Sequence, residues 1–211
     1  MQKNVYIFGA GGMAREVADI IRDMPEDYKT IGFVDKDSLN KGQALNDSII
    51  LGSIDDIKND KLEGSYFSCG FGEIDIKKRS ALEAANIGLK AISLIHPSVI
   101  KTPFVQIGEG SIVCAGSVIT NNVIIGKHTI ININATIGHD SVVGDFCTVS
   151  PGCHISGRVT IGNECYIGTG AVILPNLKVG NNSVVGAGAV VTKDVPQGVT
   201  VIGIPAKVLE K

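Results

Sequence analysis

The sequence has no tryptophan, few other aromatic residues and no apolar run long enough to cross a membrane as a helix. Its formal net charge is −2, so it lacks the surplus of basic residues typical of nucleic-acid-binding proteins. Its N-terminal residues lack the pattern of a secretory signal peptide. We therefore expect no nucleic-acid partner, no membrane span and a cytoplasmic location, with a core built from aliphatic side chains.

Cysteine is also scarce and never occurs as a CxxC pair, which is the spacing typical of zinc and redox motifs. Three of the five cysteines lie at positions that point inward in the six-residue repeat described below. We therefore expect them to be buried, small apolar residues rather than metal ligands. These three are Cys147, Cys153 and Cys165, and the other two are Cys69 and Cys114. We expect no metal site.

An aliphatic residue occupies every sixth position between Ile107 and Val191. All 15 of these slots are Ile or Val, whereas only 11 of the other 70 positions in the span are. A period of six fits neither an α-helix nor an alternating strand. It predicts a chain that turns a corner every six residues and buries one side chain per side. Three sides make a triangular coil, so the slots predict a single-stranded prism of about five coils.

The residue four places after each slot is small or of modest size, as at Ser111, Ala135 and Cys153, which fits a second inward position. Together these patterns predict a hexapeptide-repeat parallel β-helix over residues 96–211. The residue before each slot points outward, yet it is aliphatic in many coils. Such a row predicts a subunit interface, for which we expect threefold symmetry. The row includes Ile112, Val118, Ile124, Ile130, Val142, Val172, Val184 and Val190.

Residues 1–95 have a different pattern and predict a small α/β domain, half a Rossmann fold in size. Apolar runs predict strands over residues 5–8, 31–34, 49–51, 65–68 and 91–94, and helical spacing predicts helices over 13–24 and 77–86. His96-Pro97-Ser98 then leads into the repeats.

Gly9-x-Gly11-x-x-Ala14 follows a predicted strand and opens a helix, a pattern typical of phosphate binding. Asp35 ends the second strand, where it could accept a hydrogen bond from a ribose or a base. A tight turn without a ligand would give the same pattern. Binding of NAD is less favoured, because the domain lacks the second half that usually holds the nicotinamide.

His139 lies at an outward corner of the predicted prism and is followed at once by Asp140. A carboxylate beside an imidazole can fix its tautomer and raise its basicity, as a general base for attack on a thioester requires. A solvated corner histidine is the alternative. A zinc site is disfavoured, because His128, His139 and His154 fall on three different sides.

Several glycines leave the sides of the predicted prism near His139 with little side-chain bulk. Gly157 lies one coil further on, and the adjoining side holds Gly168, Gly170, Gly186 and Gly188. Such a bare groove could accept an extended pantetheine arm, although glycines that only form corners would look the same.

The whole chain resembles the sialic-acid and bacillosamine-type sugar O- and N-acyltransferases, hexapeptide-repeat enzymes with a small nucleotide-sugar-binding domain. The resemblance rests on Ile7-Phe8-Gly9-Ala10-Gly11-Gly12, Phe33-Val34-Asp35, Gly70-x-Gly72, Ile95-His96-Pro97-Ser98, the segment from Gly138-His139-Asp140 to Phe146, Ile173-Leu174-Pro175-Asn176 and Gly203-Ile204-Pro205-Ala206-Lys207. It implies a left-handed β-helix with a C-terminal cap, and a homotrimer with acetyl-CoA between adjacent β-helices.

The resemblance also implies roles for single residues. It makes His139 the general base and Asp140 its acidic neighbour. The positions that match those holding the nucleotide sugar are Gly11, Gly12, Met13, Asp35, Lys36 and Gly70, and those matching the acetyl-CoA site are Thr148, Gly157, Thr169 and Ala187. Some members carry a second histidine where this chain has Thr148, a departure that bears on the acceptor more than on the reaction type.

These features predict an acetyl-CoA-dependent transferase that acetylates the amino group of a UDP- or GDP-linked 4-amino sugar for surface glycan synthesis. O-acetylation of a sialic acid or a related hydroxyl would use the same catalytic residues. A non-catalytic nucleotide-binding β-helix protein is the alternative from another class, against which the His-Asp pair and the Gly-x-Pro-Ala-Lys ending argue. The sequence leaves the sugar, the base and the acyl chain length open.

Overall fold

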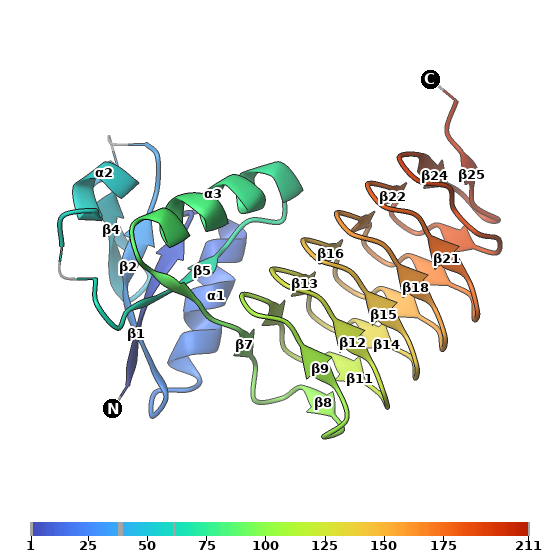
Figure 1. The fold of residues 1–211 in the computed structure, drawn as a ribbon, viewed down its shortest axis with the longest axis horizontal. Coiled ribbons are helices and arrows are strands. Elements are labelled where there is room, and N and C mark those ends of the chain that lie inside the picture. Colours follow the sequence, from blue (N-terminus) through green and yellow to red (C-terminus); the bar gives the residue numbers. More distant parts are fainter. Residues whose placement is uncertain (1, 38–39, 61, 211) are drawn as a thin grey trace. The chain divides into compact units, whose positions relative to one another are not determined.

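The computed structural model of the chain describes residues 2–37, 40–60 and 62–210. The chain forms two compact units, Met1–Leu94 and Ile95–Lys211. Strands flanked by helices form the first unit, whereas the second is a stack of short strands (Figure 1).

The first unit is built on a six-stranded sheet with the order β3-β4-β2-β1-β5-β6, in which only β3 runs antiparallel to its neighbour. Its elements are β1 (Lys3–Phe8), α1 (Gly12–Arg22), β2 (Tyr28–Val34), β3 (Ala44–Leu45), β4 (Ser48–Gly52), α2 (Ile54–Ile57), β5 (Tyr66–Cys69), α3 (Ile74–Asn86) and β6 (Lys90–Ala91).

The strand order positions a ligand site in this unit. The inner strand β1 has its last four residues buried, and α1 buries a stripe at helical spacing that includes Ala14, Val17 and Ile21. β2 and β4 lie on one side of β1, whereas β5 and β6 lie on the other. α/β sheets bind ligands where the strand order reverses in this way, outside the carboxyl ends of the strands. The loops after β1 and β5 are therefore where function is expected.

The second unit is a left-handed parallel β-helix with three sides. The first side holds β7 (Leu94–Ile95), β10 (Ile112–Val113), β13 (Ile130–Ile131), β16 (Thr148–Val149), β19 (Tyr166–Ile167), β22 (Val184–Val185) and β24 (Thr200–Ile202), and ends in the antiparallel β25 (Lys207–Val208). The second side holds β8 (Ile100–Lys101), β11 (Val118–Ile119), β14 (Thr136–Ile137), β17 (His154–Ile155), β20 (Val172–Ile173) and β23 (Val190–Val191). The third side holds β9 (Gln106–Ile107), β12 (Ile124–Ile125), β15 (Val142–Val143), β18 (Thr160–Ile161) and β21 (Lys178–Val179).

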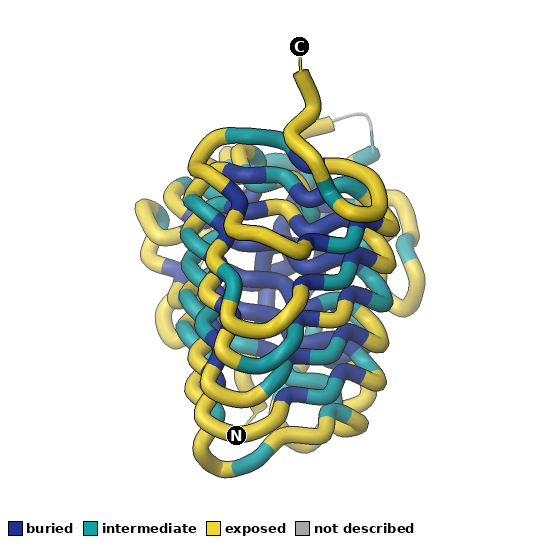
Figure 2. Tube along the Cα trace, turned by 90° about the vertical axis from the view of Figure 1, so that its right-hand side faces the viewer, coloured by how far each residue is buried: buried dark blue, intermediate teal, exposed yellow. Residues whose placement is uncertain are grey.

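The hexapeptide period is confirmed. Equivalent slots pair across coils, as Ile119 does with Ile137 and Ile137 with Ile155, and the slot residues are buried except for the half-buried Ile107 in the first coil. Buried segments stack through the coils while the corners are exposed (Figure 2). The third side has five strands, in agreement with about five coils, and the other two sides extend further at the ends.

The second inward position is confirmed as well, and where it carries a hydroxyl or thiol group there is a physical reason. Ser111 Oγ donates to the carbonyl oxygen of Gly126 at 2.6 Å, and Cys147 Sγ donates to that of Gly162 at 3.0 Å. A small hydroxyl or thiol thus satisfies a corner carbonyl from inside the prism, where an unpaired group would be costly. All five cysteines are buried, and none of them forms a disulfide.

Several element predictions were wrong in detail. The strand expected over residues 91–94 does not exist, because β6 ends at Ala91 and Leu94 begins the first strand of the β-helix. α3 begins at Ile74 rather than Lys77, since the chain is extended only up to Glu73. The strand expected over residues 49–51 is confirmed as β4, whereas β3 and α2 were missed. The two missed elements are too short to show a period, although Ser53 and Asp56 form a capping box at the start of α2.

The outward aliphatic row is less uniform than expected. Ile112 and Ile130 are buried within the single chain, whereas Ile124 is 43% exposed. Position in the hexapeptide fixes which way a side chain points, but it does not fix what covers that side chain.

Candidate active site

The loop between β1 and α1 presents bare backbone at the carboxyl edge of the sheet. A Cβ added at Gly11 or Gly12 would meet no atom within 4 Å, so both residues face open space. Gly11 is the N-cap residue of α1, and no side chain caps that end. The first N–H groups of the helix are therefore available to an anion, which the helix dipole also favours.

Two other glycines of this region are required by packing. A Cβ on Gly70 would fall 2.4 Å from the Cα of Ala14, and a Cβ on Gly9 would fall 2.9 Å from the ring of Phe71. Gly9 also has a φ of 105°, which strains any other residue. Gly70 thus lets the loop after β5 close against the first turn of α1, and contact with the protein itself is enough to explain its missing side chain.

These two loops enclose a cavity of about 210 Å³. It is lined by Ala10, Gly11, Gly12, Met13, Asp35, Gly70, Phe71, Gly72, Glu73 and Ile76. Five of the six residues expected to hold the nucleotide sugar therefore surround one space, and the sixth, Lys36, does not line it. We call this space the phosphate cavity.

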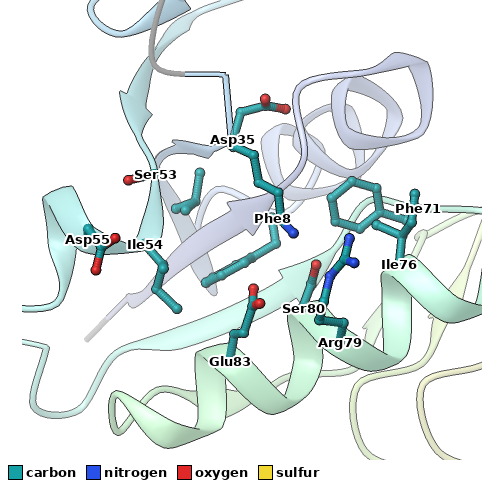
Figure 3. Close-up of a pocket in the computed structure, with 12 residues that line it drawn as sticks. Phe8, Asp35, Ser53, Ile54, Asp55, Phe71, Ile76, Arg79, Ser80 and Glu83 are labelled. Carbon is teal, nitrogen blue, oxygen red and sulfur yellow. The ribbon is translucent and has the colours of Figure 1, made fainter.

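A second cavity of about 400 Å³ adjoins the phosphate cavity, since Asp35, Phe71 and Ile76 line both. Figure 3 shows the residues around it. Lys36 lines this larger cavity, together with Phe8, Val34, Ser53, Ile54, Asp55, Arg79, Ser80 and Glu83. Sequence reasoning missed the α3 residues. Their spacing from Ile76, which is that of one helix face, was the pattern that could have found them.

His139 and Asp140 form a hydrogen-bonded pair at the edge between the second and third sides of the β-helix, in the corner after β14. His139 Nδ1 lies 2.8 Å from Asp140 Oδ2, and both side chains are about half exposed. A carboxylate can only accept a hydrogen bond, so in the neutral imidazole Nδ1 carries the proton and Nε2 keeps its lone pair. This is the tautomer that a general base needs.

Asn122, one coil earlier on the same edge, holds Asp140 in place. Its Nδ2 donates to Asp140 Oδ1 at 3.2 Å, so each carboxylate oxygen has its own partner. The hydrogen bonds from His139 and then Asn122 lower the pKa of Asp140, with a smaller contribution from the charge of Arg158. Sequence reasoning missed Asn122, although its distance of one 18-residue coil from Asp140 pointed to it.

Gly157 lies beside Nε2 of His139. A Cβ at this position would fall 2.7 Å from that nitrogen. A side chain there would press on the imidazole, so the glycine leaves room beside Nε2. The predicted closeness of Gly157 to His139 is confirmed as geometry, whereas its role remains a prediction.

The other residues expected to line acetyl-CoA lie elsewhere. Thr148 is buried on β16 of the first side. Thr169 and Ala187 are exposed at the edge between the first and second sides, where Gly188 N donates to the carbonyl oxygen of Thr169 at 2.8 Å. Gly157 belongs to the edge between the second and third sides. One chain therefore does not gather these four residues around a single point.

The remaining histidines of the prism are engaged elsewhere. His128 stacks on Phe146 with ring centroids 4.9 Å apart, and His154 Nδ1 lies 3.0 Å from Thr136 Oγ1. Among the described residues, no group of three His, Cys, Asp or Glu side chains is arranged to hold a metal ion. None of the helices in the described ranges is both long enough and apolar enough to span a membrane.

Three family models match parts of the chain. Residues 4–83 match the PglD N-terminal domain. Residues 98–121 match the hexapeptide repeat of succinyl-transferase, and residues 158–193 match the bacterial transferase hexapeptide, a model of six repeats. No curated protein sequence matches the chain.

Solved structures match it over nearly its whole length. Perosamine N-acetyltransferase from Caulobacter crescentus, crystallised with CoA and GDP-perosamine as a variant with one histidine replaced by asparagine, is 30% identical with a TM-score of 0.92, over 99% of this chain and 97% of that one. The acetyltransferase domain of PglB from Neisseria gonorrhoeae in complex with acetyl coenzyme A is 33% identical with a TM-score of 0.90, over 99% of this chain and 100% of that one. WeeI from Acinetobacter baumannii is 31% identical with a TM-score of 0.88, over the same shares.

Proposed function

This chain belongs to the sugar N-acetyltransferases that join a PglD-type N-terminal domain to hexapeptide repeats, and on that basis we propose that it transfers the acetyl group of acetyl-CoA to the amine of a nucleotide-linked 4-amino sugar. The observation that carries the proposal is the His139–Asp140 pair beside Gly157. Two of the similar structures support both substrates, because one contains acetyl coenzyme A and the other contains CoA together with GDP-perosamine.

We assign the nucleotide sugar to residues 1–95 and acetyl transfer to residues 96–211. The diphosphate would bind the free N–H groups at the start of α1, with Gly11, Gly12 and Met13 around it. Asp35, which lines both cavities, would accept from the ribose, and Lys36 would face the larger cavity. Gly70 shapes the site through its contact with Ala14.

In the proposed reaction the sugar amine attacks the thioester carbonyl carbon directly. His139 Nε2 takes the proton of the amine as the N–C bond forms, and Asp140 stabilises the resulting imidazolium through Nδ1. The tetrahedral intermediate then collapses, the C–S bond breaks, and His139 returns the proton to the leaving thiolate of CoA. A backbone N–H near Gly157 would steady the oxyanion, since a Cβ on this residue would lie 2.7 Å from Nε2 and the glycine has no side chain to block the approach.

We further propose that the active unit is a homotrimer with acetyl-CoA between adjacent β-helices. The argument is that Gly157 lies on one edge of the prism, whereas Thr169 and Ala187 lie on another, so a single acetyl-CoA would need two chains to reach all three. Exposed apolar residues such as Ile100 and Ile124 supply surface for such contacts. Light scattering during size-exclusion chromatography would test this, and a monomer that is fully active would contradict it.

A cytoplasmic location and a role in surface glycan synthesis complete the proposal. Five buried cysteines that form no disulfide are compatible with a reducing compartment, and nucleotide sugars are activated units for glycan assembly. Fractionation of cells that express a tagged chain would test the location.

The experiment that tests the activity is release of CoA thiol from acetyl-CoA by the purified protein. The panel contains UDP- and GDP-linked 4-amino sugars, with free sialic acid as a comparator. Release with a nucleotide amino sugar is expected. Release with sialic acid alone would contradict the proposal and favour O-acetylation.

A further inference from the structure

We propose that the larger cavity of the N-terminal unit binds the base of the nucleotide sugar and selects guanine over uracil through Glu83. The inference rests on the proposed function, because it assigns the nucleotide of the sugar substrate. It starts from residues of α3 that the sequence motifs do not include.

The position of the cavity points to the base. It adjoins the phosphate cavity and shares Asp35 with it, so a nucleotide whose diphosphate lies at α1 and whose ribose lies at Asp35 would extend its base into the larger space. The lining includes Phe8, Val34 and Ile54, whose apolar surfaces suit the faces of a flat ring. The cavity volume of about 400 Å³ leaves room for a purine.

Polar groups of α3 face this space. Arg79 and Glu83 lie one helical turn apart, and Figure 3 shows both side chains projecting from α3 toward the cavity. Within the part of the chain that the structure describes, neither forms an ion pair. A donor fork and a carboxylate therefore face a partly apolar cavity without satisfying each other, which leaves both for a ligand.

The hydrogen-bonding pattern decides between the bases. Guanine presents two adjacent donors, N1–H and the N2 amino group, which match the two oxygens of one carboxylate. Uracil presents a single N3–H between two carbonyl groups, so the second carboxylate oxygen would face a carbonyl oxygen. Guanine also offers O6 and N7 as acceptors, the pair that arginine binds with both of its donors. Glu83 with Arg79 thus fits guanine better than uracil.

The test is isothermal titration calorimetry of the full-length protein with GDP and with UDP. We expect GDP to bind about 10-fold more tightly than UDP, the difference made by one charge-assisted hydrogen bond. Glu83→Gln should remove that preference, because its amide group places a donor against the guanine donors. Glu26→Gln is the matched control, an exposed glutamate of the same unit that does not line the cavity, and it should keep the preference.

Each other outcome contradicts the inference. Equal or tighter binding of UDP by the unmodified protein would overturn the selection of guanine while leaving the proposed acetyltransferase intact. A GDP preference that survives Glu83→Gln, in protein with an unchanged melting temperature, would overturn the role of Glu83. Binding of neither diphosphate would overturn the inference and the nucleotide part of the proposed function together.

Discussion

The two units of the molecule place their functional residues in different ways. In the β-helix, Asn121, His139, Gly157 and Pro175 occupy the same corner in four successive coils, so the position of His139 in the fold can be found by counting. In the α/β unit nothing repeats, and the site is assembled from the ends of β1, β2 and β5 and one face of α3. In a repeat, the residue number alone shows where a side chain points. In a sheet without a repeat, the direction of a side chain can be predicted only once the topology is known.

The largest expected effect, and the strongest test of this contrast, comes from placing a charge at one of the buried sixth-position slots of the β-helix. Ile161→Asp would bury an unpaired carboxylate in the core of the prism and should cost more than about 4 kcal/mol in the free energy of unfolding. Thr160→Asp, the exposed neighbour on the same strand, should cost less than about 0.5 kcal/mol. Urea unfolding of both variants gives the comparison. Equal losses would mean that the hexapeptide position does not set burial.

The next largest effect is on catalysis and comes from a corner residue rather than from a buried slot residue. His139→Ala should lower kcat by about 10²-fold or more, because the attacking amine loses its base. The melting temperature should hardly change, since the side chain is 54% exposed. His154→Ala, at another exposed histidine of the prism, is the control. Near-normal turnover in the His139 variant would remove this residue from the mechanism.

Substitutions at two glycines of the α/β unit should distinguish a role in ligand binding from a role in packing. Gly70→Ala should lower stability by about 1–3 kcal/mol, because its Cβ would clash with Ala14. Gly11→Ala has open space and should fold normally, but its methyl group would obstruct the anion and weaken nucleotide binding by about 10-fold. Melting curves and calorimetry measure the two properties. A Gly70 variant of unchanged stability would contradict the packing role.

Asn122 offers a smaller, positioning effect. Asn122→Gly removes the donor to Asp140 but keeps a residue suited to the φ of 54°, so kcat should fall about 3- to 10-fold with an unchanged KM. Asn176→Gly, on the same edge with a φ of 63°, is the matched control. The pH profile of kcat/KM distinguishes positioning from structure, because only loss at Asn122 should alter its acid limb.

The smallest effect is a pH dependence of stability. Hydrogen bonds from His139 and Asn122 lower the pKa of Asp140 below its ordinary 3.8. The unfolded chain then binds a proton before the folded one does, so the stabilisation is complete above that ordinary value and is lost as the pH falls through the lowered one. The stability difference between the wild type and Asp140→Asn should shrink as the pH falls below about 4. A difference that grows as the pH falls through that range would contradict the pKa direction.

The sequence predicts most of the β-helix, because a strict period translates directly into burial. Ile137 and Ile155 could be placed in the core, and His139 on a corner, from their numbers alone. The glycine loop was also predictable, since Gly11 and Gly12 follow an apolar strand. Each of these predictions rests on a local pattern with one structural solution.

Other features depend on contacts that no local pattern encodes. Arg79 and Glu83 face a cavity only because α3 lies beside the ends of β1 and β2. Leu94 begins the β-helix because β7 pairs with β10 on the first side of the prism. The apolar side chain alone would suit a strand of the α/β unit equally well. Thr148 is buried on the first side of the prism, whereas Thr169 and Ala187 share one exposed edge, so a local pattern does not show how the three would form one site.

The most direct measurement is identification of the product formed from acetyl-CoA and a GDP-linked 4-amino sugar, by mass spectrometry and NMR. We predict one acetyl group attached through an amide to the sugar amine, with the nucleotide intact and with formation lost in His139→Ala. An acetyl ester on a hydroxyl, or an amide that forms equally well without His139, would contradict N-acetylation by this His-Asp pair.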